Sequence, residues 1–143
     1  ALIERAPAQL VVVNRTAERA RSLVDRHRPL ATAHGVDLRG GGLDESGCDF
    51  DLVINSSASS VQGAPPPVAA SVLGTDALAV DLMYGAPAQA FLDWARRHGA
   101  LARDGLGMLV EQAAEAFALW RGVRPDTAPV LAALRLHLAG AAR

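Results

Sequence analysis

Short apolar segments that alternate with helix-like segments are the feature that most constrains the fold of this chain. Residues 9–13 read Gln-Leu-Val-Val-Val, a β-branched run typical of a strand that is buried on both faces of a parallel sheet. Further strands are predicted at residues 36–39, 51–54, 77–82 and 100–102, and helices at 17–27, 88–98, 106–120 and 125–138. Strands and helices in this alternation indicate an α/β fold with a parallel sheet.

The helices carry apolar positions at helical spacing, which predicts the faces that they bury. Thr16 is placed to cap the first helix, and Pro29 and Gly35 are expected to mark its exit. Pro125 suits the first turn of the last helix. The predicted inward residues are Ala20, Leu23 and Val24 in the first helix, Phe91, Trp94 and Ala95 in the second, and Leu109, Val110, Ala113, Phe117 and Trp120 in the third.

The composition excludes several classes of function. A length of 143 residues fits one domain, and the formal net charge of −1 gives no basic field for nucleic acid or a membrane surface. No segment approaches the roughly 18 apolar residues that span a bilayer, and residues 1–10 do not resemble a signal peptide. The single cysteine, Cys48, and the four histidines show no metal-ligand spacing, so we expect no metal site. The expectation is a cytoplasmic protein.

The start of the chain does not match the beginning of a doubly wound nucleotide-binding fold. That fold begins with a strand, a glycine-rich turn and a helix whose N-terminus holds the pyrophosphate, whereas residues 1–6 resemble the tail of a helix. The first strand of that fold lies between the second and the fourth, so its removal leaves two unpaired edges. We therefore predict an incomplete Rossmann-like parallel sheet, lacking its first strand and glycine-rich turn, in a chain that is a fragment or needs the missing segment for stability.

Two glycine clusters are poor substitutes for the missing turn. Gly40–Gly42 lacks the spacing of a pyrophosphate loop and is predicted to form a turn. Residues 105–110 imitate the Gly-x-Gly-x-x-Gly pattern with valine in the third glycine position, but no strong strand precedes them. The glycines at 105 and 107 suit a close approach of the backbone to a ligand and a tight helix start.

Residues 14–19 follow the first predicted strand at the place where such folds meet the adenosine ribose. An acidic side chain there selects NAD, whereas arginine accommodates the 2′-phosphate of NADP. Asn14 and Arg15 occupy this position, Thr16 offers a hydroxyl, and Arg19 lies one helical turn beyond Arg15, where the two arginines could form a clamp. A capped surface helix with solvated arginines explains the same spacing equally well.

Four motifs, in order along the chain, resemble the shikimate dehydrogenase family. Asn14-Arg15-Thr16 followed by Arg19-Ala20 is similar to its NADP-binding motif. The others are Asp51-Leu52-Val53-Ile54-Asn55-Ser56-Ser57, Asp81-Leu82-Met83-Tyr84, and the segment Asp104-Gly105-Leu106-Gly107-Met108-Leu109-Val110 with Gln112-Ala113. Ser56-Ser57 replaces the more usual Ala-Thr, and Leu82 stands where many relatives have Met. The resemblance covers essentially the whole chain, as one NADP-binding domain of residues 1–143.

The resemblance implies the cofactor half of an enzyme that reversibly reduces 3-dehydroshikimate to shikimate with NADPH, on the route to chorismate and the aromatic amino acids. Asn55, Ser56, Ser57, Leu82 and Gly105 would then lie near the cofactor. Tyr84 and Gln112 would contact the substrate, although a boundary tyrosine and a solvated glutamine fit their positions as well.

The catalytic Lys–Asp pair of that family belongs to its N-terminal domain. All 14 basic residues of this chain are arginine, so the chain holds no catalytic lysine, and we expect it to be inactive alone. The helix at 125–139 would pack towards the absent substrate domain, and the full-length protein is a candidate homodimer. Two alternatives remain: an inactive nucleotide-binding fragment, and a quinate/shikimate dehydrogenase that uses NAD, which the lack of an acidic residue near Asn14 disfavours.

Overall fold

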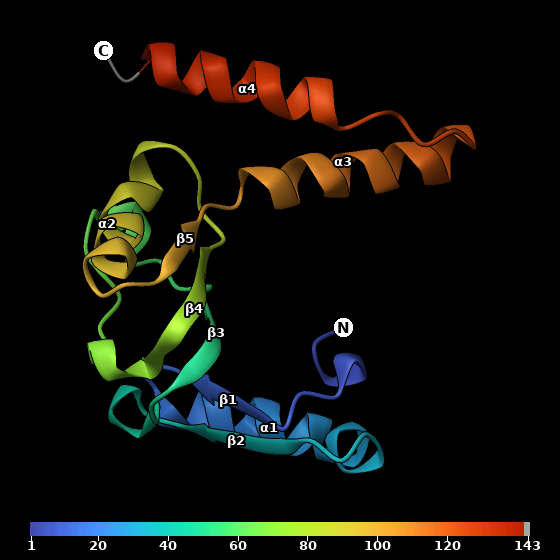
Figure 1. Cartoon of the computed structure of the whole chain (residues 1–143). Coiled ribbons are helices and arrows are strands. Elements are labelled where there is room, and N and C mark those ends of the chain that lie inside the picture. The colour runs from blue at the N-terminus through green and yellow to red at the C-terminus, as the bar shows by residue number, and fades with distance from the viewer. Residues whose placement is uncertain (142–143) are drawn as a thin grey trace. The chain divides into compact units, whose positions relative to one another are not determined.

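The strands of the chain form two separate parallel sheets in two compact units (Figure 1). The structure is a computed structural model, and it describes residues 1–141. The first unit comprises Ala1–Asp49 and Pro67–Val72, and the second comprises Phe50–Pro66 and the chain from Leu73 onwards. The predicted α/β class is confirmed, with parallel pairing throughout both sheets.

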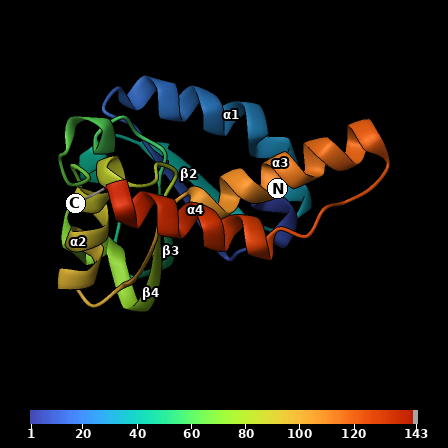
Figure 2. The same ribbon diagram turned by 90° about the horizontal axis from the view of Figure 1, so that it is seen from above.

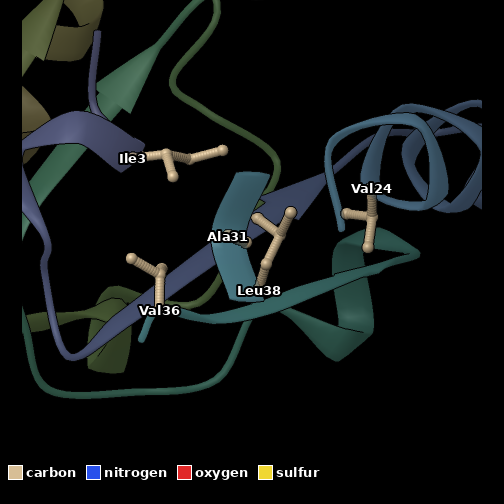
Figure 3. Close-up of a cluster of buried hydrophobic side chains, with 5 residues drawn as sticks. All are labelled: Ile3, Val24, Ala31, Val36 and Leu38. Atoms are coloured by element: carbon tan, nitrogen blue, oxygen red, sulfur yellow. The ribbon is translucent and has the colours of Figure 1, made fainter. Parts of the chain in front are cut away.

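The first unit is a pair of strands covered by one helix. β1 (Gln9–Val13) pairs in parallel with β2 (Asp37–Gly41), and α1 (Ala17–Ala33) connects them. Figure 3 shows the core of this unit, where side chains from the N-terminal turn, α1 and β2 meet. The buried residues of this cluster are Ile3, Val24, Ala31, Val36 and Leu38, with Leu10 and Val12 of β1 partly buried against them.

α1 is longer than the sequence predicts, because packing overrides a helix-breaking residue. Pro29 lies inside the helix rather than at its exit, although a proline there removes one backbone hydrogen bond. The helix continues because Ala31 extends the buried positions Ala20 and Val24 by two more turns and joins the core. Leu23, predicted to face inward, is exposed.

Two of the three glycines after residue 39 are part of β2, so the predicted turn over Gly40–Gly42 does not form there. Gly40 and Gly41 lie within the strand, and only Gly42 follows it. A Cβ atom on Gly40 would lie 2.7 Å from Cγ2 of Val24 and 2.9 Å from the carbonyl oxygen of Ala20. Glycine is therefore needed at residue 40 because the backbone of β2 passes directly beneath α1.

The second unit is a three-stranded sheet in the order β3-β4-β5, with all strands parallel. The strands are β3 (Phe50–Asn55), β4 (Leu73–Asp81) and β5 (Leu101–Arg103), and α2 (Gln89–Arg97) packs on β4 and β5. Phe91, Trp94 and Ala95 are buried on the inner face of α2, as predicted. The rings of Phe91 and Trp94 lie 5.6 Å apart.

Two further helices follow the sheet of the second unit. α3 (Leu106–Arg121) and α4 (Ala128–Ala141) run side by side in opposite directions, as Figure 2 shows. Pro125 lies before α4 rather than in its first turn, and Asp126 accepts a hydrogen bond from the Ala128 N–H at 3.0 Å. Short 3-10 turns are found at Ile3–Arg5, Leu43–Glu45, Ser60–Gln62, Ala70–Val72 and Ala86–Ala88.

The buried face of α3 differs from the one that the sequence predicts. Leu106, Val110 and Ala114 are buried, whereas Ala113, Phe117 and Trp120 are exposed. The buried residues lie in the first half of α3, whereas the distal apolar residues Phe117 and Trp120 have no neighbour that covers them in the described part of the chain. None of the helices in residues 1–141 is long and apolar enough to cross a membrane.

Candidate cofactor-binding site

The turn after β1 is shaped by the side chain of Asn14. Its Oδ1 accepts a hydrogen bond from the Thr16 N–H at 2.9 Å, and the Asn14 N–H donates to the carbonyl of Gly41 at 3.2 Å. Thr16 is the N-cap residue of α1, as predicted, but its hydroxyl makes no capping hydrogen bond. The turn therefore leaves the hydroxyl of Thr16 exposed just after the carboxyl end of a strand, where doubly wound folds bind ligands.

Arg15 lines a cleft of about 710 Å³ within the first unit. One wall of the cleft is the turn after β2. The other wall is formed by residues 67–71, where the chain returns to the first unit. The lining residues are Arg15, Ala17, Gly42, Leu43, Asp44, Glu45, Ser46, Gly47, Pro67, Val68, Ala69 and Ser71. A volume of this size lies within the range of ligand pockets, about 300–1,000 Å³.

The wall of this cleft is fixed by Glu45. Its Oε1 accepts hydrogen bonds from the Gly42 N–H at 2.9 Å and from Nη2 of Arg21 at 3.0 Å. The backbone hydrogen bond from Gly42, aided by the charge of Arg21, holds the pKa of Glu45 below its usual value. Arg21 is thus engaged by an acid, whereas Arg15 has no acidic partner within 4 Å in residues 1–141.

Arg19 lines a different depression, so the structure does not bring it together with Arg15 in one cleft. The second depression runs along α1 and also includes Asn14 and Thr16. Its other lining residues are Val12, Glu18, Ala20, Ser22, Leu23 and Arg26. Arg15 and Arg19 thus line different depressions, and the two-arginine clamp stays a prediction.

In the second unit, a buried network of polar side chains ties together the ends of β3 and β4. Asn55 Nδ2 donates to Ser60 Oγ at 2.9 Å and to Asp81 Oδ2 at 3.3 Å, and the Ser60 hydroxyl donates to the same carboxylate oxygen. Asp81 Oδ1 accepts a hydrogen bond from the Met83 N–H at 3.0 Å. Asp81 therefore has a structural hydrogen-bonding role, since this side chain is fully buried.

Asn55 is occupied by this network rather than turned outward. Besides the two bonds that its amide donates, its Oδ1 accepts from the N–H of Ser57 at 3.1 Å and from the Ser57 hydroxyl at 2.7 Å. Ser56 and Ser57 are exposed at the start of the loop. The side chain of Asn55 therefore holds the loop in place, and the loop presents the two serines.

Leu82 and Gly105 lie against each other. The Leu82 N–H donates to the carbonyl of Asn55 at 3.0 Å, and the Gly105 N–H donates to the carbonyl of Met83 at 2.8 Å. A Cβ atom on Gly105 would collide with the carbonyl group of Leu82. Gly105 is therefore required by a close approach of two backbone segments, and the exposed Leu82 side chain lies next to that contact.

Asp104 and Arg135 join the turn before α3 to α4. Arg135 donates from Nη1 to Asp104 Oδ2 and from Nη2 to Oδ1, both at 2.5 Å. Burial alone would raise the pKa of Asp104. The hydrogen bonds from Arg135 and from the Leu106 N–H outweigh burial and hold this pKa below its ordinary value.

Tyr84 and Gln112 are both exposed in the second unit. Tyr84 follows Met83 directly, and 39% of the residue is accessible. Gln112 lies on α3, and none of the described contacts joins it to Tyr84 or Gly105. Within the second unit, hydrogen bonds thus join the loops that carry Ser57, Leu82 and Gly105.

Several residues of these sites were not singled out from the sequence. Ser60 and Arg135 gave no signal, because a serine in a loop and an arginine on a helix are ordinary surface residues. Pro67–Ala69 lie in a loop that contacts the first unit only in the folded chain, so the sequence does not indicate their place in the cleft.

Residues 1–141 contain no group of metal-ligating side chains. Exposed Cys48 has a pKa raised by a hydrogen bond to Asp49, which disfavours its thiolate.

Comparison with known proteins finds similarity to shikimate dehydrogenases. The family model described as "Shikimate 5'-dehydrogenase C-terminal domain" matches residues 105–135. The NADP(+) shikimate dehydrogenase of Acidovorax ebreus is 57% identical over 141 residues, which is 99% of this chain and 50% of that protein. The chain therefore spans about half the length of the curated relatives that it matches.

The chain is also similar to solved protein structures. A shikimate 5-dehydrogenase from Thermus thermophilus, in complex with NADP(H) and shikimate, is 30% identical with a TM-score of 0.68, over 92% of this chain and 47% of that one. An Ael1 enzyme from Pseudomonas putida is 45% identical with a TM-score of 0.76, over 90% of this chain and 46% of that one. These likenesses agree with the Rossmann-like class predicted from the sequence.

Proposed function

We propose that this chain, which is similar to shikimate dehydrogenases, is the cofactor-binding part of an NADP-dependent shikimate dehydrogenase. The observation that carries the proposal is Arg15. It lies two residues after the end of β1, lines the cleft of the first unit, and has no acidic partner within 4 Å in the described chain. An arginine at this position favours the 2′-phosphate of NADP, where an acid would favour NAD.

The cleft is suited to the adenosine end of NADP. The guanidinium of Arg15 can make a bidentate contact with the 2′-phosphate, and the exposed hydroxyl of Thr16 can donate a further hydrogen bond. Oδ1 of Asn14 already accepts a hydrogen bond from the Thr16 N–H, so the role of Asn14 is to shape the turn. Arg19 lies in the neighbouring depression and contributes positive charge without sharing the cleft. On the opposite side of the cleft, the apolar residues Pro67 and Val68 offer a surface for the adenine base.

The second unit is suited to the nicotinamide end. Leu82, next to Gly105, supplies an apolar surface, and the loop of Ser56 and Ser57 supplies polar groups beside it. Bound NADPH would supply a hydride to the carbonyl carbon of 3-dehydroshikimate, and the protein contributes position and electrostatics. Tyr84 and Gln112 can hydrogen-bond the polyhydroxylated substrate. We assign no catalytic residue in this chain, because it contains no lysine.

The cofactor assignment is tested by titrating the chain with 2′,5′-ADP and with 5′-ADP, which differ only in the 2′-phosphate. We expect 2′,5′-ADP to bind at least about tenfold more tightly, since a hydrogen bond to a charged group contributes about 1.5–3 kcal/mol. Arg15→Ala should remove most of this difference. Arg28→Ala is the matched control, because Arg28 lies on α1 after the turn of Arg15, is paired with Asp25, and lines neither depression. Equal affinity for the two nucleotides would refute the proposal.

The activity of the whole protein is tested with the product of the natural gene that contains this sequence. We expect it to oxidise shikimate with NADP, followed as the appearance of NADPH absorbance, and to prefer NADP to NAD. The rival interpretation, an inactive nucleotide-binding module, predicts binding of 2′,5′-ADP without turnover in any form of the protein.

A further inference from the structure

The ion pair between Arg135 and Asp104 differs from the other ion pairs of the described chain. Only 7% of the Asp104 side chain is exposed, whereas the acidic partners in the other ion pairs are 47% exposed or more. Exposed pairs contribute little to stability, while a buried carboxylate that loses its partner is strongly disfavoured. The geometry is two-pronged, with each nitrogen of the guanidinium fork facing one carboxylate oxygen.

Asp104 connects three segments that meet beside Gly105. Its carboxylate accepts from Arg135 of α4 and from the N–H of Leu106 at the start of α3, and the backbone of Gly85 after β4 helps to lower its pKa. The Leu138 side chain of α4 also lies beside Gly85. The last helix thus contacts the turns after β4 and β5 at two points, one polar and one apolar.

These contacts bear on the surface that would meet the nicotinamide. Gly105 follows Asp104 directly, and its backbone is held against Leu82 and Met83 without space for a Cβ atom. If Arg135 is removed, Asp104 keeps a buried charge without a counter-ion. The carboxylate then gains by moving towards water, which would pull Gly105 away from Leu82.

We propose that Arg135 is a positioning residue: through Asp104, it holds the Gly105 turn against Leu82 and so shapes the surface that receives the nicotinamide ring. This inference rests on the proposed function. It concerns only the second unit, because Arg135, Asp104, Gly105 and Leu82 all belong to it. Binding of the adenosine end, assigned to the first unit, is therefore independent of Arg135.

The test compares two ligands and three variants of this chain. Arg135→Met keeps the length of the side chain without its charge, and Arg135→Lys keeps the charge without the two-pronged geometry. Arg124→Met is the matched control, since Arg124 forms exposed ion pairs with Glu111 and Glu115 on α3. The ligands are NADPH and 2′,5′-ADP, and amide hydrogen exchange at Gly105 and Leu106 reports the turn directly.

In Arg135→Met, we expect NADPH affinity to fall about tenfold, the affinity for 2′,5′-ADP to change less than twofold, and exchange at Gly105 and Leu106 to accelerate. Arg135→Lys should recover part of the NADPH affinity, and Arg124→Met should match the wild type. Three results would overturn the proposal: unchanged exchange and NADPH affinity, parallel loss of both ligands, or wild-type NADPH affinity no higher than that for 2′,5′-ADP. Failure of the wild type to prefer 2′,5′-ADP to 5′-ADP refutes the proposed function instead.

Discussion

Asp81 holds two loops with a single, fully buried carboxylate. Its partners are the Ser60 hydroxyl, the Asn55 amide and the Met83 N–H. We expect Asp81→Ala to lower the free energy of unfolding by about 3 kcal/mol, because it leaves buried donors unsatisfied. Ser60→Ala, which removes one donor, should cost about 1–2 kcal/mol. Urea denaturation measures both, with exposed Ser56→Ala as the control. If Asp81→Ala cost no more than the control, the network would not stabilise the loops.

For single residues, the sequence could predict which side chains follow the end of a strand, but not which side chains are brought into contact by folding. Asn14 and Arg15 could be assigned because a strand end in this class of fold fixes where the ribose lies. Ser60 and Arg135 could not, because their partners are 21 and 31 residues away in the chain and are brought near only by packing. That Arg15 and Arg19 line different depressions could not be predicted either, since spacing along the chain does not specify which depression each side chain lines.

Among the elements, the contact between α1 and β2 depends on the absence of a side chain at Gly40. We expect Gly40→Ala to destabilise the chain by about 1–3 kcal/mol, because the new Cβ would meet the backbone of Ala20, which cannot move aside without shifting the helix. Gly107→Ala on α3 is the control. It meets open space and should be neutral or stabilise by up to about 1 kcal/mol. The melting temperatures of the two variants, measured by thermal unfolding, test this difference. Equal melting temperatures would contradict the close packing.

The attachment of α4 to the second unit should depend on pH. The folded-state pKa of Asp104 lies below its ordinary value, so its ionised form stabilises the fold above about pH 4. This stabilisation is lost as the pH falls through the lower folded-state pKa. We therefore expect the difference in unfolding free energy between wild type and Arg135→Met to be full at pH 7 and to shrink below about pH 4. Urea denaturation at pH 7, 5 and 3 measures it. An equal difference at pH 7 and pH 3 would contradict an ionised Asp104.

The helices also show what hydrophobic spacing can and cannot predict. The inner face of α2 was predictable because that helix is short and covered along its length. On α3, the spacing predicted a stripe through Phe117 and Trp120, but 45% and 80% of these residues are exposed. Apolar spacing identifies a face that favours burial, and it does not say whether a partner is present. Pro29 illustrates the opposite case, in which the burial of Ala31 sustains a helix that local propensity would end.

For the whole molecule, the absence of lysine leads to a prediction about activity. We expect the purified chain to bind 2′,5′-ADP and yet to show no oxidation of shikimate with NADP, because the family's catalytic lysine has no counterpart among its 14 basic residues, all arginine. The natural gene product should turn over under the same conditions. Spectrophotometry at a saturating concentration of both substrates measures the rate. Turnover by the purified chain, retained in Arg15→Ala at high NADP, would mean that residues of this chain carry the proton transfer, and the assignment of catalysis to a lysine elsewhere would be wrong.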